Sequence, residues 1–440
     1  MNKTINKIFT TSIFVFFFFV FLFTRSFMGI YILGYRIGEL AILSAVLFLF
    51  LYFFLSFNSN IFKLFEKEIK YALYLILITF FLTILFSKQF NFDTYIFKAS
   101  SYIWTLGYVF LGYLLSLHFK IKKLYINFSL AILIYIYYVA IQDLPMSVQD
   151  FFLSISDKYE PHKGSDILIM FVSILYLFTR VNNKRLSVEV LIIFGALFLP
   201  LLLYKSRGAF IALLIYLIVE TFKLRKEILN SSFFRNLLLI LFTLLLFFQS
   251  VFLVTGSGAV KINMANDKLD EVTQYRAPEL KPGEYVNYLF FKDNRFYSTD
   301  VNINWRIQIW QDVIFDLRDD GKLLLGNGYF NKIPAMAALD HEGNSVRSGL
   351  DGLNENVHNN LVNIFARGGL VHLTLFLYLY YQLIKKYKLK FGNYDILVLM
   401  TPILFTSFFD ASMENSHYPL IFYFLLGSSF NLNLITKNNN

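Results

Sequence analysis

The chain has 440 residues, of which 57% are hydrophobic and only 16% are charged, and this balance excludes a water-soluble fold. The apolar residues form a series of runs of roughly 17 to 25 residues, each long enough to cross a hydrocarbon core about 30 Å thick as a helix. These runs do not alternate apolar and polar positions, which excludes the strands of a membrane β-barrel. The composition therefore predicts a protein that crosses a membrane several times as helices.

The net charge of +10 would suit nucleic-acid binding, but the basic residues are scattered between the apolar runs rather than gathered on one face. Their placement indicates membrane orientation instead, and no nucleic-acid partner is predicted. The chain has no cysteine, which excludes disulfides, thiolate metal sites and cysteine nucleophiles. The chemistry must therefore come from other side chains.

Twelve apolar windows predict an all-α membrane protein with about 12 transmembrane helices. Lys3 and Lys7 precede the first window, as in a signal peptide, but no small-residue cleavage pattern follows, so this window is predicted to be a retained first helix. The windows are residues 9–27, 39–57, 69–87, 97–117, 124–142, 165–180, 187–204, 207–222, 234–256, 359–383, 394–411 and 417–434.

The connections between these windows differ in their content of lysine and arginine. With the N-terminus in the cytoplasm, the inward connections are rich in basic residues, whereas the short outward connections carry about two each. This asymmetry follows the positive-inside rule and predicts that both termini are cytoplasmic. The inward basic residues are Lys63, Lys67, Lys70, Lys120, Lys122, Lys123, Arg180, Lys184, Arg185, Lys223, Arg225, Lys226, Arg235, Lys385, Lys386, Lys388 and Lys390.

One outward connection is far longer than the others. It covers residues 257–358, and it separates helices 1–9 (residues 1–256) from helices 10–12 and a short cytoplasmic tail (residues 359–440). Apolar residues recur every four positions over residues 303–319, which predicts an amphipathic helix that lies against the membrane surface or against the helix bundle. These residues are Trp305, Ile309, Val313 and Leu317.

Two cations lie in the short outward hairpin between the seventh and eighth predicted helices. Lys205 and Arg207 face the side that normally carries few basic residues. Two interpretations are open: snorkelling side chains at a helix end, which is the commoner case, or cations that bind a ligand. Gly208 directly follows Arg207 and leaves room for a substrate to approach the backbone.

Arg306 lies on the predicted amphipathic helix between Trp305 and Trp310. Taken alone it is a surface arginine, but tryptophan concentrates at membrane interfaces, which would place this guanidinium at headgroup height, where it can bind a phosphate bidentately. His358 begins the tenth predicted helix. A lone histidine at a membrane boundary is more often an interfacial polar residue than a catalyst. Imidazole is nevertheless the side chain best suited to take a proton at neutral pH, and the neighbouring Asn359 can orient it.

The remaining polar features carry weaker signals. The other histidines show no paired-ligand spacing, so no metal site is predicted. Gly326-Asn327-Gly328 lacks the third glycine and the flanking strand and helix of a dinucleotide site, and it is predicted to be a turn. Asp410 and Glu414 lie in the last outward turn, either as partners of the outward arginines or as ordinary loop-tip acids.

Three elements in this order resemble the O-antigen ligase and O-antigen polymerase superfamily of bacterial inner-membrane glycosyltransferases. Each element is short, but their order, their shared outward side and their position around one large loop make the combination specific. The resemblance covers roughly residues 190 to 375, and the first six windows match only as hydrophobic helices. The elements are Ser206-Arg207-Gly208; Arg306 to Trp310 followed by Leu325 to Tyr329; and His358-Asn359-Asn360-Leu361 leading to Gly369 through Leu373.

The resemblance implies transfer of a glycan from undecaprenyl pyrophosphate to an acceptor hydroxyl, at the periplasmic face of the inner membrane and without a metal or cofactor. It implies that Arg207 and Arg306 hold the pyrophosphate, since two guanidiniums can stabilise the charge that builds on this leaving group. It implies that His358 activates the acceptor hydroxyl, which is a poor nucleophile by itself. The candidate substrate-binding residues are Lys205, Asn359 and Trp310.

One departure from the family pattern follows the histidine. Relatives often have an acidic residue before the first glycine here, whereas this chain has Arg367 before Gly368. If that acid orients the histidine or the acceptor in relatives, Arg367 puts such a role in doubt for this chain.

The acceptor separates two forms of the reaction. A ligase uses lipid A core and a polymerase uses a second lipid-linked glycan, and the ligase is slightly favoured. A protein O-glycosylating relative is disfavoured, because the chain ends soon after its last predicted helix. A lipid-linked oligosaccharide flippase or other transporter would keep charged residues near the bilayer midplane, whereas Arg207, Arg306 and His358 lie near the outward boundary. A sugar transferase with metal-binding acids in its first outward loop is disfavoured, because residues 28–38 contain no acid.

Overall fold

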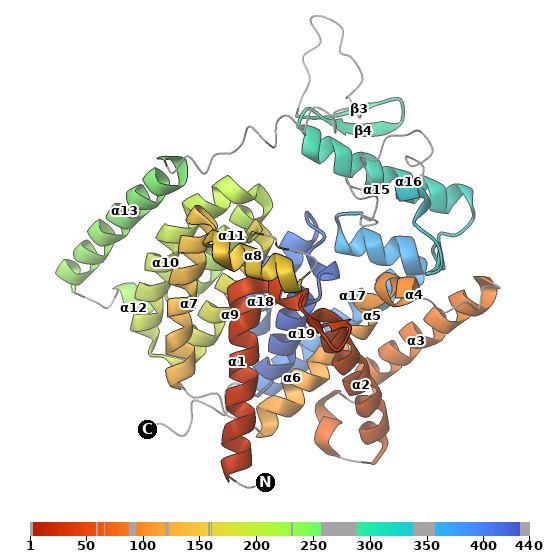
Figure 1. Ribbon diagram of the computed structural model, residues 1–440, viewed down its shortest axis with the longest axis horizontal. Helices are drawn as coiled ribbons and strands as arrows, with labels where there is room; N and C mark the ends of the chain where they lie inside the picture. The colour runs from red at the N-terminus through yellow and green to blue at the C-terminus, as the bar shows by residue number, and fades with distance from the viewer. Residues whose placement is uncertain are drawn as a thin grey trace, which may run out of the picture. The chain divides into compact units, whose positions relative to one another are not determined.

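The computed structural model is built mainly of helices, with two short antiparallel β-hairpins (Figure 1). It describes residues 3–58, 60–65, 67–87, 94–118, 123–156, 159, 161–229, 232–256, 288–337 and 357–431. The elements in chain order are α1 (Lys3–Met28), β1 (Tyr31–Ile32), β2 (Tyr35–Arg36), α2 (Ile37–Asn58), η1 (Asn60–Phe65), α3 (Glu68–Ser87), α4 (Thr94–Ala99), α5 (Ser101–Trp104), α6 (Gly107–His118), α7 (Lys123–Gln142), α8 (Met146–Ile155), α9 (Gly164–Val181), α10 (Lys184–Lys205), α11 (Arg207–Lys223), α12 (Arg225–Leu229), α13 (Phe233–Gly256), β3 (Leu289–Lys292), β4 (Arg295–Ser298), α15 (Val301–Asp319), α16 (Pro334–Ala337), α17 (Asn360–Phe391), α18 (Asp395–Ser407), η2 (Ser412–Glu414) and α19 (His417–Ser429).

Each of the predicted apolar windows coincides with helix in the described part of the chain. Eight of these helices have at least 18 residues and are apolar enough to cross a membrane. The window at 97–117 is divided among α4, α5 and α6, and the helices α11, α18 and α19 have 17, 13 and 13 residues. An all-α membrane protein is therefore confirmed, whereas the count of 12 crossings stays a prediction.

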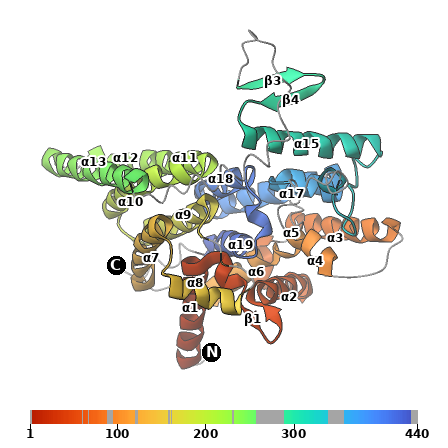
Figure 2. The same ribbon diagram turned by 45° about the horizontal axis from the view of Figure 1, so that its top comes forward.

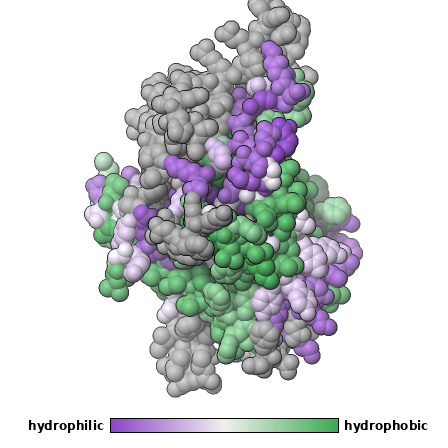
Figure 3. Space-filling model, turned by 90° about the vertical axis from the view of Figure 1, so that its right-hand side faces the viewer, coloured by the Kyte–Doolittle hydropathy of each residue, from purple (hydrophilic) through white to green (hydrophobic). Residues whose placement is uncertain are grey.

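The long helices differ in how much of their surface other helices cover. The apolar window of α9 is 78% buried, whereas that of α13 is 11% buried and exposes Leu241, Leu245 and Phe248 among others. Figure 3 shows hydrophobic side chains in green over the broad middle of the face that it presents. Apolar surface of this extent is normal only where lipid covers it, because lipid tails replace the missing protein contacts.

Contacts group the chain into two compact units, which are described separately below. Unit 1 comprises residues 1–64, 104–259 and 384–440, and unit 2 comprises residues 65–103 and 260–383. The predicted boundaries of the outward loop, at residues 256 and 358, concern membrane sidedness and stay a prediction. Of that loop, residues 257–287 and 338–356 lie outside the described residues.

Unit 1 has a core of closely packed helices. Gly112 of α6 lies against the carbonyl of Phe424 in α19, and Gly427 of α19 lies against the carbonyl of Val109 in α6, so that a Cβ at either glycine would overlap the facing backbone. Small residues allow membrane helices to approach this closely, and the approach increases their van der Waals contact. The helix α9, which is buried along most of its length, completes this core.

Unit 2 contains the predicted amphipathic helix, which the structure confirms as α15. Its residues Ile309, Val313 and Leu317 have no exposed surface and pack in one apolar cluster with residues of α16 and of the start of α17. Figure 1 shows α15 beside α16, and Figures 1 and 2 both show the β3–β4 hairpin beyond α15. Of the two predicted positions for this helix, the structure therefore supports packing against protein. The hairpin itself was not predicted.

The helix α17 is broken at Gly369, which has φ 64° and ψ −166°. Backbone groups that such a break frees inside a membrane must be bonded within the protein. Residues 323–328 do this, because their amides and carbonyls pair with those on both sides of the break. The four hydrogen bonds are Asn327 N to Ala366 O (2.8 Å), Gly328 N to Arg367 O (3.0 Å), Leu370 N to Leu323 O (2.9 Å) and Val371 N to Leu324 O (3.2 Å).

The predicted turn at residues 326–328 is therefore confirmed, and it bonds to the backbone of the broken helix α17. Gly326 and Gly328 both have positive φ, at 71° and 77°. A Cβ on Gly326 would lie 2.5 Å from the carbonyl oxygen of Arg367, so only glycine allows the turn to reach the broken helix. The apolar window predicts a single helix here, whereas the structure has two half-helices held by this turn.

We expect Gly326→Ala to destabilise the protein more than Gly321→Ala, its matched control. Both glycines have positive φ, 71° and 67°, so alanine meets a similar backbone strain of about 1 kcal/mol at each. Nothing lies within 4 Å of a Cβ at Gly321, whereas at Gly326 the turn must move away from α17. Thermal unfolding of the purified protein in detergent should show an additional loss of at least about 1 kcal/mol for Gly326→Ala. Equal losses for the two variants would contradict the docked turn.

Candidate functional site

The predicted cationic hairpin lies in unit 1 and is as short as the sequence suggests. The helix α10 ends at Lys205 and α11 begins at Arg207, so Ser206 is the C-cap of one and the N-cap of the other. The Ser206 hydroxyl accepts a hydrogen bond from the amide of Ala209 at 3.3 Å, which satisfies one free amide at the start of α11. Both Lys205 and Arg207 are exposed.

Close backbone packing fixes this hairpin. A Cβ on Gly164, the first residue of α9, would lie 2.5 Å from the Cβ of Ser206, so α9 begins directly against the hairpin. On another side, Gly208 lies against the ring of Phe409, which follows α18. The position of the Arg207 backbone is thus set by its neighbours, while its side chain remains exposed.

Two hydrogen bonds, one partly buried and one buried, join the elements around this hairpin. The Ser165 hydroxyl donates to the Asp410 carboxylate at 2.5 Å, and Nε2 of His417 lies 2.8 Å from the Asp166 carboxylate. Both members of the second pair are 1% exposed. These contacts connect the start of α9 to the turn between α18 and α19, and neither pair was predicted from the sequence.

His358 and Arg306 both lie in unit 2, where α15 holds the segment that carries the histidine. The Trp305 ring packs edge-on against the His358 ring, with 4.8 Å between centroids and 61° between planes. Trp310 donates a hydrogen bond from Nε1 to the carbonyl oxygen of Val357 at 2.7 Å. Arg306 directly follows Trp305 on α15. One helix therefore positions the histidine and also carries one of the two candidate arginines.

The backbone after the histidine is also constrained. His358 has φ 53°, in the left-handed region that residues other than glycine seldom occupy. The Asn359 side-chain oxygen then accepts hydrogen bonds from the amides of Leu361 at 3.0 Å and Val362 at 3.1 Å, so it caps the first turn of α17. The contacts of Asn359 and Trp310 support roles in positioning His358. Direct substrate contact by Asn359, Trp310 or Lys205 stays a prediction.

Arg367, the departure from the family pattern, is a buried residue of α17 that binds the docked turn. It is 3% exposed and donates hydrogen bonds to the carbonyl oxygens of Gly328 at 3.3 Å and Asn331 at 2.6 Å. A third goes to the Tyr95 hydroxyl at 2.9 Å. A buried guanidinium with several acceptors is stable in this environment. These contacts give Arg367 a role in holding the turn next to the break.

On the C-terminal side of the break, the buried His372 belongs to a hydrogen-bond network that sequence reasoning missed. Its Nδ1 lies 2.9 Å from the Tyr102 hydroxyl and 3.0 Å from the Tyr329 hydroxyl, and these two hydroxyls are 2.7 Å apart. Its Nε2 lies 2.6 Å from the Thr79 hydroxyl, which itself donates to the Leu75 carbonyl. The Thr79 oxygen therefore accepts a hydrogen bond from Nε2–H, and Nδ1 accepts a hydrogen bond from a tyrosine hydroxyl.

This network connects α3, α5 and α17 to the motif residue Tyr329. Burial raises the pKa of Tyr329 well above its ordinary value, so its hydroxyl stays protonated and able to donate. A signal for the network was present in the sequence, because a histidine inside an apolar window is costly unless it has partners. What the sequence does not give is the identity of those partners, which come from three distant segments.

The described residues contain no group of three or more histidine, aspartate or glutamate side chains that could hold a metal ion. The prediction of a site without a metal remains untested by this observation.

We expect Asn359→Ala to lower stability and Asn359→Ser to retain most of it. Alanine cannot accept the two amide hydrogen bonds of the cap, and the loss of such a cap costs about 1 kcal/mol, whereas serine is itself a good N-cap. The midpoint of thermal unfolding in detergent measures the difference. Equal stability for the two variants would show that the cap contributes nothing.

No curated protein matches the chain. A family model described as O-antigen ligase matches residues 190–377, which include the cationic hairpin, α15, the histidine and both halves of α17 up to residue 377. This range agrees with the one over which the sequence motifs show the resemblance. Residues 190–377 therefore match the O-antigen ligase family, and this match supports membership in the O-antigen ligase and polymerase superfamily.

Proposed function

We propose that this protein is an O-antigen ligase-like glycosyltransferase, which moves a glycan from undecaprenyl pyrophosphate to a hydroxyl of lipid A core at the periplasmic face of the bacterial inner membrane. The family match over residues 190–377 carries the proposal, because it covers all three of the proposed catalytic residues. The family implies lipid-linked glycans as substrates in general. The acceptor, the lipid carrier and the membrane face are part of the proposal.

In this proposal His358 is the general base for the acceptor hydroxyl. A histidine base needs a fixed ring position as well as a suitable proton affinity, since a small displacement of the reacting atoms lowers the reaction rate strongly. The ring of His358 contacts Trp305, and the carbonyl before it is bound by Trp310. These contacts support the role of a general base, because they restrict the position of the imidazole ring.

The two arginines are assigned to the pyrophosphate. Pyrophosphate is already a good leaving group, so the protein must chiefly stabilise the negative charge that builds as the glycosyl bond breaks. Guanidinium groups suit this task because they stay charged and bind phosphate oxygens in pairs. Arg306 is supported by its place on the helix that positions His358, whereas Arg207 and Lys205 are assigned from the motif.

A flippase for lipid-linked oligosaccharides is the second candidate, and the break in α17 favours it. Transporters commonly use the free backbone groups of a broken helix to bind their substrate. Here, however, four of these groups are already bonded to residues 323–328, and Arg367 is bonded to carbonyls of the same loop. The break therefore attaches the loop to α17 rather than binding a transported substrate. This favours the glycosyltransferase over the flippase.

His358→Ala should reduce glycan transfer by at least about a hundredfold, because a positioned base contributes this much or more. Transfer is measured with the purified protein in proteoliposomes that contain lipid-linked glycan and lipid A core. Membrane insertion and protein level should match the unmodified protein, because the side chain is half-buried and carries no cap. Transfer close to the unmodified rate would contradict the proposed base.

Arg306→Ala should lose most transfer, and Arg306→Lys should recover little of it, because a point charge cannot bind two phosphate oxygens as a guanidinium does. Arg318→Ala is the matched control, since Arg318 lies on the same helix, is exposed and forms an ion pair with the exposed Asp319. The same comparison for Arg207 uses Arg225→Ala as control. Full recovery of transfer by the lysine variants would contradict bidentate phosphate binding and would show that the arginines contribute only their positive charge.

Deletion of the gene in its native host distinguishes the two forms of the reaction. Gel analysis of surface polysaccharide should show free lipid A core and an accumulation of long lipid-linked chains if the protein is a ligase. Core that carries a single repeat unit would instead identify a polymerase. An unchanged profile would contradict both forms for this polysaccharide.

A further inference from the structure

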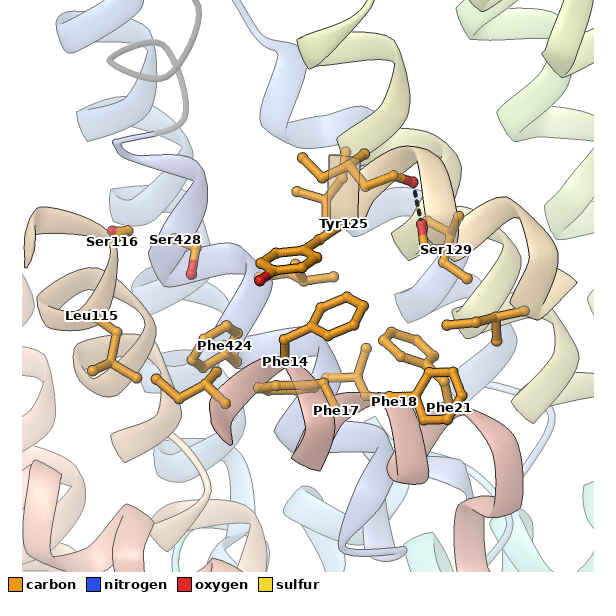
Figure 4. A pocket seen from close by; sticks show the side chains of 17 residues that line it. Phe14, Phe17, Phe18, Phe21, Leu115, Ser116, Tyr125, Ser129, Phe424 and Ser428 are labelled. Carbon is orange, nitrogen blue, oxygen red and sulfur yellow. Dashed lines mark hydrogen bonds between the residues drawn. The ribbon is translucent and has the colours of Figure 1, made fainter. Parts of the chain in front are cut away.

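Unit 1 contains an apolar cavity of about 120 Å³ that the proposed reaction does not use. Five helices line it, and Figure 4 shows aromatic rings from α1 and α7 that face a ring of α19 across it. The Phe14 ring stacks on the Tyr125 ring with 4.6 Å between centroids, and the Phe17 ring lies at the same distance from the Phe424 ring. The aromatic lining residues are Phe14, Phe17, Phe18, Phe21, Tyr125 and Phe424.

The size and lining of this cavity suit a piece of a hydrocarbon chain. An apolar cavity of about 150 Å³ stays free of water and accepts a benzene-sized molecule, so this one has room for a few carbon atoms of a chain that continues outside it. Its floor, which includes Ile174 and Ile421, is buried, whereas its rim on α1 and α7 is only half-buried. Because α1 is largely uncovered by protein, this rim is open to membrane lipid.

One end of the cavity carries positive charge. The lining residue Ser116 accepts a hydrogen bond from the side-chain amide of Asn431 at 2.8 Å, and the oxygen of that amide accepts one from Nζ of Lys390 at 3.2 Å. A second cation, Lys123, begins α7 only two residues before the lining residue Tyr125 and is exposed. An apolar chain site with two lysines at one end has the chemistry of a site for an anionic lipid.

The cationic end also lies at a different depth from the Arg207 hairpin. Gly164 at the start of α9 packs against Ser206 of that hairpin, whereas the lining residues Ile174 and Leu177 lie 10 and 13 residues further along the same helix. At 1.5 Å per residue, this separates cavity and hairpin by about 15 to 20 Å along α9. A lipid whose phosphate lies beside Lys123 and Lys390 is therefore distinct from one whose phosphate lies at Arg207.

We propose that this cavity holds an acyl chain of an anionic phospholipid from the cytoplasmic leaflet, with the headgroup phosphate beside Lys123 and Lys390. The predicted sidedness agrees, because both lysines belong to connections that the basic-residue pattern places inside, where anionic lipids attract lysine. The lipid supports the packing of α1, whose own contacts with protein are few. This proposal stands without the proposed enzymatic function.

Native mass spectrometry of the full-length protein in detergent tests the site. The protein is stripped of lipid and then supplied with phosphatidylglycerol, phosphatidylethanolamine or undecaprenyl phosphate. We expect one phosphatidylglycerol to bind at least about tenfold more tightly than phosphatidylethanolamine. Equal binding of these two lipids, or displacement of phosphatidylglycerol by undecaprenyl phosphate at this site, would overturn the proposal.

A cavity-filling substitution identifies where this lipid binds. Ser129 lines the cavity and donates to the carbonyl of Ile126, and Ser154 makes the same kind of bond to Phe151 on the exposed face of α8. Ser129→Phe should abolish the bound phosphatidylglycerol, whereas the matched Ser154→Phe should retain it. Retention by Ser129→Phe would overturn the proposal.

Two further measurements keep the test independent of how Ser129→Phe folds. The double substitution Lys123→Gln with Lys390→Gln should remove the preference for phosphatidylglycerol, whereas Lys184→Gln with Lys226→Gln, two other lysines of unit 1, should leave it. In a Phe17→Trp variant supplied in detergent with one brominated phosphatidylglycerol per protein, the bromine atoms should quench the added tryptophan fluorescence more than in a Phe54→Trp control, whose ring lies on the exposed face of α2 outside the cavity. An unchanged lipid preference in the first pair, or equal quenching in the second, would overturn the proposal.

Discussion

A helix that breaks inside a membrane exposes amides and carbonyls that no water can satisfy, and this constraint organises unit 2. The break at Gly369 is stable because residues 323–328 bond to the backbone on both sides of it. That docking requires glycine at 326, and it brings Arg367 within reach of the carbonyls of the same loop. In the same unit, α15 packs its apolar face on the start of α17, and Trp305 of α15 contacts the His358 ring.

The proposed chemistry depends on this arrangement more than on any unusual property of the candidate residues. Imidazole and guanidinium groups can perform proton transfer and phosphate binding without a large change in their ordinary acidity. What the protein must add is a fixed position for the imidazole and guanidinium groups. Trp305 contacts the ring of His358, Trp310 binds the carbonyl before it, and the Asn359 cap fixes the helix that follows.

Sequence reasoning succeeded where a local pattern determines a structure. Apolar windows located the helices, a four-residue repeat located α15, and the glycine pair located the turn at 326–328. It failed where distant segments meet. The packing of α15 on protein, the break in α17 and the buried partners of His372 depend on contacts between residues far apart in the chain. Arg367 illustrates the difference, because the sequence shows only that it departs from the family pattern, whereas the structure shows that it is buried and donates hydrogen bonds to Gly328, Asn331 and Tyr95.

In the proposed mechanism, His358 is the base that takes the proton of the acceptor hydroxyl. The test is the rate of glycan transfer as a function of pH, with donor and acceptor both saturating. A histidine base must be deprotonated to act, so the rate should rise with pH as the imidazole loses its proton and then become constant. The rise should be absent from the residual activity of a His358→Gln variant. A rate that does not change with pH, or the same rise in the variant, would contradict the account.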